Sequence, residues 1–268
     1  MRSNGSIEAT ISPPPALSRY CRLGDRSKQL VVAAFSALLT FVVGIAASEA
    51  LVYSGSSGSL SASADFELIG STLTVTLTNT STADVLVPAD LLTGVFFNTT
   101  YTLTPVSAAL NGSTVYYGSF VNSVGEGFQY KSGVSAQGMN SGISGTGLGI
   151  FGPDGNFFLP GVTLNGLDYG ILSAGDDSGT GNTGVTGHGP LIKNSVEFTL
   201  TAGDGFSLSE LGSTVVFQYG TSTTEPTITA QCDDCVRRQL QVPEPASVLL
   251  LVSGLAGLTL WERRRRTG

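Results

Sequence analysis

Two apolar runs, one near each end of the chain, constrain the fold more than any other feature of the sequence. The first covers residues 30–47 and the second covers residues 246–261, and neither contains a charged residue. Runs of this kind are typical of membrane-directed segments rather than of a globular core. We therefore expect the globular part of the chain to lie between them.

The N-terminal run has the layout of a secretory signal peptide. Four basic residues between positions 19 and 28 precede it, and small residues follow it. Because Ser48-Glu49-Ala50 fits the small-x-small rule, we expect signal peptidase to cleave after Ala50. Residues 1–50 then form the signal peptide, with a helical apolar core at 30–47. An uncleaved transmembrane anchor is the alternative, since a run of this length can nearly span a bilayer.

The C-terminal segment, residues 242–268, has three parts. Pro243, Glu244 and Pro245 come first, and two prolines so close together block regular structure ahead of the apolar run. The run at 246–261 would form a transmembrane helix of about 24 Å, which is marginal for a hydrocarbon core of about 30 Å. A cluster of arginines follows and is expected to stop transfer on the cytoplasmic side. The cluster consists of Arg263, Arg264, Arg265 and Arg266.

This tail closely resembles the PEP-CTERM sorting signal of Gram-negative bacteria, with all three parts in the same order. The resemblance implies recognition by an exosortase, a membrane transpeptidase-like enzyme that removes the tail. It also implies transient residence in the inner membrane, delivery to the cell surface, outer envelope or extracellular matrix, and a link with exopolysaccharide and biofilm. An ordinary single-pass tail anchor is the alternative.

The part between the ends, residues 51–241, is acidic and poor in charge. Asp and Glu outnumber Lys and Arg there by 15 to 4, and charged residues make up 12% of the whole chain, against about 25% in ordinary soluble domains. Lys, Glu and Arg are too scarce to cover the helices of a bundle. An acidic surface also repels nucleic acid, so we expect no nucleic-acid partner.

Strand patterns dominate this middle part and predict an all-β fold. Residues 73–78 alternate strictly between apolar residues and threonine, which is typical of a strand with one buried face. Short strands separated by Gly, Asn and Asp favour an antiparallel β-sandwich at residues 65–230. Long glycine-rich loops are expected between 134 and 189, and partial disorder of this region is the alternative. Further strands are expected at 94–98, 101–106, 114–121, 128–131, 195–201 and 214–219.

Four shorter segments complete the predicted organisation. Residues 51–64 are rich in Ser and Gly and are predicted to form a flexible lead-in, and residues 231–241 a linker. Residues 88–92 and 207–211 are each expected to contain a short helical step, with Ser207 and Glu210 placed for a capping box in the second.

Parts of the middle region also resemble one subgroup of exosortase-dependent surface proteins. The resemblance implies that the region is a single exported family domain, and it brings no catalytic residues with it. It thus favours a non-enzymatic protein. The similar stretches are 73–80, 88–97, 168–171, 175–177 and 190–196.

Cys232 and Cys235 have the spacing of a known functional motif and form the first candidate site. Their spacing suits a thiol redox pair or half of a zinc site, but no second Cys pair or nearby histidine accompanies them. Two aspartates between them would raise the pKa of a thiolate, which disfavours reactivity. In an oxidising exported location we expect a local disulfide. The alternatives are a metal-binding or redox function, or cysteines that stay free or form intermolecular disulfides.

The remaining candidates give weaker signals. A Ser/His/Asp triad would have to use His188, the only histidine, and no Gly-x-Ser-x-Gly elbow accompanies it. A structural Ca²⁺ is conceivable among aspartates that lie between glycines, but no established calcium loop is present. We assign no metal, no cofactor and no catalytic residue. The aspartates are Asp168, Asp176, Asp177 and Asp204.

These patterns predict a non-enzymatic exported surface or matrix protein. Its expected partners are signal peptidase and exosortase as processing enzymes, with exopolysaccharide as a further candidate. One alternative is a carbohydrate-binding or carbohydrate-cleaving domain on the same anchor, at which the aromatic pairs 116–117 and 157–158 hint. The other alternative is a Ca²⁺-dependent adhesin.

Overall fold

Almost all of the regular structure in the described part of the computed structural model is β-strand. The structure describes residues 48–116, 124–157, 163–177, 179–186, 190–233, 235 and 265. All of them belong to the second of the two units into which the chain divides, residues 1–46 and 47–268. The described strands are β1 (Ser48–Ser57), β2 (Leu60–Ile69), β3 (Thr72–Asn79), β4 (Leu92–Phe97), β5 (Thr104–Leu110), β6 (Thr114–Tyr116), β7 (Gln129–Ala136), β8 (Met139–Ser144), β9 (Gly170–Leu172), β10 (Leu191–Lys193), β11 (Ser195–Thr201), β12 (Thr214–Tyr219) and β13 (Thr227–Cys232). The described helical elements are the short helix α2 (Thr183–Thr186) and the 3₁₀ turns η2 (Pro88–Asp90), η3 (Gly125–Gly127) and η4 (Leu208–Glu210).

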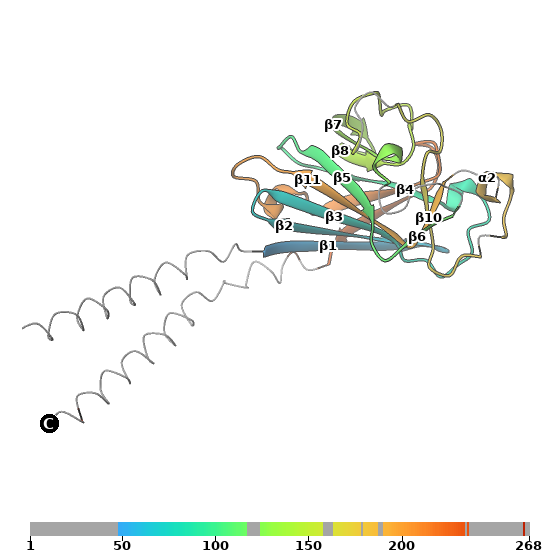
Figure 1. Cartoon of the computed structure of the whole chain (residues 1–268), viewed down its shortest axis with the longest axis horizontal. Helices are drawn as coiled ribbons and strands as arrows, with labels where there is room; N and C mark the ends of the chain where they lie inside the picture. The colour runs from blue at the N-terminus through green and yellow to red at the C-terminus, as the bar shows by residue number, and fades with distance from the viewer. Residues whose placement is uncertain are drawn as a thin grey trace, which may run out of the picture. The chain divides into compact units, whose positions relative to one another are not determined.

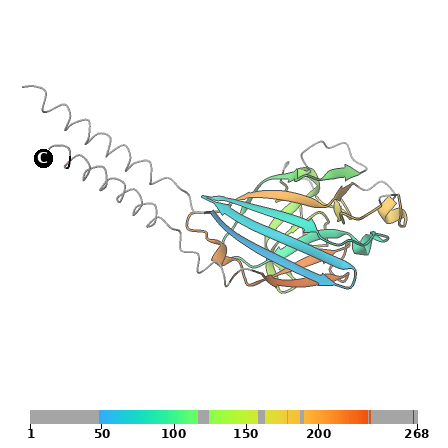
Figure 2. The ribbon, with the colours of Figure 1, turned by 90° about the horizontal axis from the view of Figure 1, so that it is seen from below.

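The strands join into one hydrogen-bonded sheet that curls around a common core (Figures 1 and 2). Their order is β5-β11-β3-β2-β1-β13-β12-β4-β9-β10-β6, and β8 pairs with both β4 and β7. The described pairs are antiparallel except β9 with β10. The predicted all-β class is therefore confirmed. The described strands pair into one continuous sheet with facing halves, so the finer prediction of a sandwich is not confirmed.

Alternation of apolar and polar residues explains the middle of the sheet. Leu73, Val75 and Leu77 of β3 are fully buried, while the threonines between them are half-buried. In the neighbouring strands, Phe66 of β2 and Phe198 of β11 lie opposite Val75 and are also fully buried. The strands predicted at 73–78, 195–201 and 214–219 are confirmed as β3, β11 and β12.

Aromatic side chains join the two facing halves of the sheet. The Phe66 ring lies 5.5 Å from the Tyr53 ring and 5.4 Å from the Phe97 ring, edge-on in both cases. Phe97 belongs to β4, which is four places from β2 in the strand order, and its ring stacks on that of Tyr130 in β7 at 6.4 Å. These contacts are possible only because the sheet curls, and they bury large apolar surfaces in its interior.

The prediction of a flexible lead-in at residues 51–64 is wrong. These residues lie in β1 and β2, which form a hairpin paired from Ser48–Ile69 to Ser57–Leu60. Leu51, Tyr53, Ala62 and Ala64 are buried at alternate positions, so serines such as Ser54 and Ser63 occupy the other face. The linker predicted at 231–241 likewise begins inside β13, which ends at residue 232.

Other boundaries differ from the predictions for local reasons. The strand expected at 101–106 is β5, which starts later because the Thr99 hydroxyl accepts a hydrogen bond from the Tyr101 amide and holds a bend there. β8 lies in the region predicted as loops. A Cβ atom on its Gly142 would come within 2.5 Å of the Phe96 ring. The glycine therefore allows close packing in a strand and does not mark a turn.

The two predicted helical steps are confirmed as the 3₁₀ turns η2 and η4. The Ser207 hydroxyl accepts a hydrogen bond from the Ser209 amide, as expected for an N-cap. The carboxylate that accepts from the first amide of η4, that of Leu208, belongs to Glu49 in β1 and not to Glu210. A residue at the start of the domain therefore completes a cap far along the chain.

We predict that Phe66→Ala lowers the free energy of unfolding by about 3–5 kcal/mol, because it leaves a cavity between two buried rings. Urea unfolding of the purified protein measures this loss. Val106→Ala is the control, since Val106 is 52% exposed, and its change should stay within about 0.5 kcal/mol. Equal losses in the two variants would contradict the role given to Phe66.

Candidate functional site

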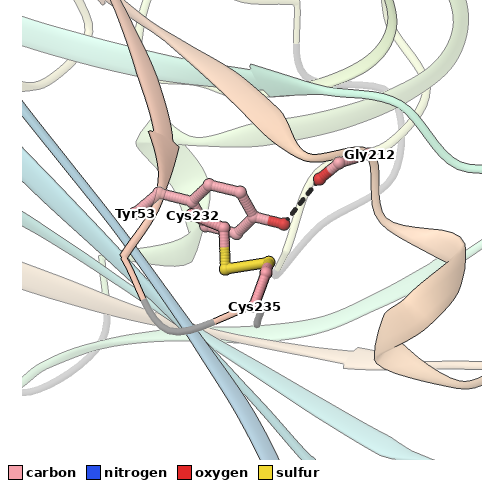
Figure 3. Close-up of a disulfide and its surroundings, with 4 residues drawn as sticks. All are labelled: Tyr53, Gly212, Cys232 and Cys235. Carbon is pink, nitrogen blue, oxygen red and sulfur yellow. Dashed lines mark hydrogen bonds between the residues drawn. A yellow bond between two sulfur atoms is a disulfide. The ribbon is translucent and has the colours of Figure 1, made fainter. Parts of the chain in front are cut away.

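The last described strand ends in a group of contacts just ahead of the C-terminal tail. We call the group of Tyr53, Gly212, Cys232 and Cys235 the C-terminal junction (Figure 3). Cys232 and Cys235 form a disulfide, with their sulfur atoms 2.05 Å apart and their Cα atoms 5.5 Å apart. Because each sulfur is bonded to the other, neither serves as a metal ligand or a nucleophile in this state.

Tyr53 connects the disulfide to the core. It lies opposite Cys232 in the pairing of β1 with β13, its side chain is fully buried, and its hydroxyl donates a 2.7 Å hydrogen bond to the Gly212 carbonyl. Burial raises the pKa of Tyr53 to about 12. The hydroxyl therefore stays protonated and remains a donor at physiological pH.

Further hydrogen bonds hold the chain to the sheet as far as residue 233. The Asp233 amide donates to the Val52 carbonyl at 2.8 Å, and the Asp233 carboxylate accepts from the Ser54 hydroxyl at 2.6 Å. The Cys232 amide donates to the Ser213 carbonyl at 3.0 Å. The junction therefore stabilises the end of β13 and fixes the point at which the chain leaves the domain.

A second cluster joins two loops on another part of the domain. We call Asp84 and Asp176 the aspartate clasp. Asp176, which is 4% exposed, accepts a 2.8 Å hydrogen bond from the Val85 amide, and Asp84 accepts one of 3.1 Å from the Asp177 amide. The Thr180 hydroxyl donates to the other oxygen of Asp84. Each loop therefore supplies a carboxyl group to a backbone amide of the other loop.

The two carboxyl groups of the clasp differ in acidity. Burial, reinforced by the neighbouring Asp84, raises the pKa of Asp176 to about 6, against the lowering effects of the Val85 amide and of Lys193. Hydrogen bonds from Thr180 and from Asp176 lower the pKa of Asp84. Protonation of Asp176 leaves a single charge on the pair and so removes the repulsion that two close carboxylates would have.

Of the other aspartates that were considered for calcium, Asp177 joins this cluster through its backbone amide, whereas Asp168 and Asp204 lie in other turns. Asp168 accepts a local 2.8 Å hydrogen bond from the Asn165 amide, and Asp204 is exposed in a turn. Within the described ranges, no three His, Cys, Asp or Glu side chains are grouped so that they could hold a metal ion. The partnership of Asp84 with Asp176 was missed, because nothing in the local sequence connects positions so far apart.

Several predicted site residues lie outside the described residues. They include His188, Pro243, Glu244, Pro245 and both apolar runs, and only Arg265 of the arginine cluster is described. In the part of the chain that the structure describes, no helix is long and apolar enough to cross a membrane. Ala50, the predicted cleavage position, is described and lies in β1 opposite Glu67.

The described members of the aromatic pairs considered for carbohydrate binding, Tyr116 and Phe157, are packed into the domain and are not exposed on its surface. Phe157 is 2% exposed, and its ring packs 5.1 Å from that of Phe198. Tyr116 is half-buried in β6. A pocket of about 300 Å³ lies beside Tyr130, Lys131 and Asp154. The Lys131 amine already donates to the Ile150 carbonyl at 2.5 Å, so the pocket presents neither an open aromatic platform nor an unengaged amine.

Comparison with known proteins identifies the tail. Residues 241–266 match the model of the PEP-CTERM protein-sorting motif. No curated protein and no solved structure matches the chain. The chain therefore carries a PEP-CTERM sorting motif directly after the C-terminal junction, and the match supports a surface protein targeted by an exosortase.

We predict that dithiothreitol lowers the melting temperature of the protein by about 4–8 °C. A disulfide that closes so short a loop contributes about 2 kcal/mol, and each kcal/mol shifts the melting temperature of a domain of this size by about 2–4 °C. The double variant Cys232→Ser, Cys235→Ser should melt at the lower temperature with or without the reductant. An unchanged melting temperature of the wild-type protein in dithiothreitol would contradict this role for the disulfide.

We predict that Asp176→Asn raises the melting temperature at pH 7.5 and leaves it nearly unchanged at pH 4. The folded-state pKa of Asp176, about 6, lies above its ordinary value of 3.8. Ionisation of this buried group therefore costs stability as the pH rises through this range, and the amide removes that cost while keeping an acceptor for Val85.

Thermal unfolding between pH 4 and pH 8 measures the effect of Asp176→Asn. Asp177→Asn is the matched control, because it removes the same charge from the adjacent, exposed position. It should show no such gain with rising pH. A lower melting temperature for Asp176→Asn at pH 7.5 would show that the clasp needs a second charge.

Proposed function

We propose, from the PEP-CTERM motif at residues 241–266, that this chain is a non-enzymatic surface protein of a Gram-negative bacterium. The signal peptide starts its translocation, and the apolar segment at 246–261 holds it briefly in the inner membrane. Arg263–Arg266 stay on the cytoplasmic side. An exosortase then recognises Pro243-Glu244-Pro245 and removes the tail, so that the domain reaches the cell surface or the extracellular matrix.

The observation that carries this proposal is the position of the motif. It begins a few residues after Cys235, where the disulfide ends the described part of the domain. A folded domain followed within a few residues by a sorting segment is the arrangement expected of a protein that is exported by this route. A disulfide at this point also agrees with folding in an oxidising compartment outside the cytoplasm. The curled sheet serves in this proposal as a sandwich-like carrier with no catalytic centre of its own.

The outer face of the sheet supports a place in a hydrated polysaccharide matrix. Across β2, β3 and β11, the positions between the buried residues carry hydroxyl and carboxylate groups. Such groups keep a surface wet and acidic without offering it to nucleic acid or anionic lipid. We propose exopolysaccharide as the setting of this face. Its two rows in register are Asp65, Thr76 and Glu197, and Glu67, Thr74 and Thr199.

We predict that a host with an exosortase converts the wild-type chain to a form that lacks the arginine tail, whereas the same host without the enzyme does not. Replacement of Pro243, Glu244 and Pro245 by alanine should keep the tail on the chain and the chain in the membrane fraction. Mass spectrometry of the C-terminal peptide, together with cell fractionation, measures both outcomes.

Arg264→Lys is the matched control for the motif variant, since it preserves the charge that stops transfer and should be processed like the wild type. Intact chains with their arginine tail dissolved in the cytosol would contradict the proposed function.

A further inference from the structure

The first strand of the domain reaches further toward the N-terminus than cleavage after Ala50 allows. β1 begins at Ser48, and its first three residues are paired with the end of β2. Cleavage after Ala50 would remove these residues and leave the end of β2 without its partner on that side. The pairs concerned are Ser48 with Ile69, Glu49 with Leu68, and Ala50 with Glu67.

The Glu49 side chain adds a contact outside the sheet. One of its carboxylate oxygens accepts hydrogen bonds from the Leu208 amide at 3.1 Å and from the Ser207 hydroxyl at 3.3 Å. Leu208 is the first residue of η4, and the first amides of a helical turn have no acceptor within the turn. Glu49 supplies that acceptor, and Leu208 itself is 2% exposed. A residue with this function belongs to the folded protein and not to a discarded leader.

Two independent observations place the boundary just before Ser48. The chain divides into its two units between Ala46 and Ala47. The sequence Gly44-Ile45-Ala46 supplies a second small-x-small pattern at that point, directly at the end of the apolar run. The division into units and the cleavage rule therefore agree on the Ala46–Ala47 peptide bond. This bond lies ahead of Ser48, the first described residue of β1.

We propose that signal peptidase cleaves between Ala46 and Ala47, so that the mature chain begins at Ala47 and keeps β1 whole; this rests on the proposed export of the protein. The step is a hydrolysis. Water is added across the Ala46–Ala47 peptide bond, which leaves a carboxylate on Ala46 and an ammonium group on Ala47. The leader of residues 1–46 departs, and Glu49 remains to cap η4.

Mass spectrometry of the N-terminal peptide tests the proposal. The full-length precursor is expressed in a Gram-negative host that has its own signal peptidase, and the exported protein is purified and digested. The expected peptide begins at Ala47. A peptide that begins at Glu49 or Leu51 overturns this inference but leaves the proposed export intact. A chain that keeps its basic leader and its arginine tail in the cytosol overturns both.

Two precursor variants sharpen this test. Ala46→Phe places a large residue where the rule requires a small one, so the peptide beginning at Ala47 should be lost. Ala50→Phe is the matched control and should still give the peptide that begins at Ala47. Both results are read from the N-terminal peptide and do not depend on the stability of the variant. The opposite pattern, with only Ala50→Phe blocking cleavage, overturns the proposal.

The cap gives a second readout. In the exported protein, Glu49→Ala should lower the melting temperature by about 2–4 °C, the shift expected for losing one such contact. Glu49→Gln should recover most of that loss, because its amide oxygen can still accept from the Leu208 amide. Identical melting temperatures for the wild type and both variants would show that Glu49 is not part of the folded domain, and would overturn the argument for keeping it.

Discussion

Pairing between the first and last strands of the domain is the constraint on which its other contacts depend. β1 lies between β2 and β13, so Tyr53 and Cys232, from opposite ends of the described chain, share one strand pair. Because that pair is antiparallel, the start of β1 and the end of β13 lie at the same end of the domain. A parallel pair would have separated them by the length of the strands.

The same sheet divides its residues between a dry face and a wet face with very few positive charges. Rings such as those of Phe66 and Phe97 fill the inside, while threonines and carboxylates cover the outside of β2, β3 and β11. The two lysines of the described ranges, Lys131 and Lys193, both donate to backbone carbonyls in loops. Positive charge is thus used to hold loops, and the surface is left acidic and well hydrated.

Local patterns predicted the parts of the fold that depend on neighbouring residues, and non-local contacts account for what was missed. β3 and β11 were found because alternation between a buried and a wet position is visible in any short window. The β1–β2 hairpin was missed because its many Ser and Gly residues resemble a linker in composition. Its apolar residues nevertheless recur at every second position, as in a strand, for example Leu51 and Tyr53. The disulfide could be predicted because its two cysteines lie only three residues apart in the sequence. The aspartate clasp joins positions 84 and 176, which only the folded sheet brings together.

The short distance between the folded domain and the sorting motif explains why the geometry of this end matters. Pro243 follows Cys235 by eight residues, and eight residues span at most about 28 Å when fully extended. An exosortase acting at the motif must therefore work close to the end of the domain, where β1, β13 and the disulfide meet. A loose end there would bring unpaired strands against the membrane and the enzyme. The contacts of Tyr53, Asp233 and the disulfide keep the last strand paired up to residue 233. An exosortase that acts at the motif therefore works beside a completed domain only after this junction has folded.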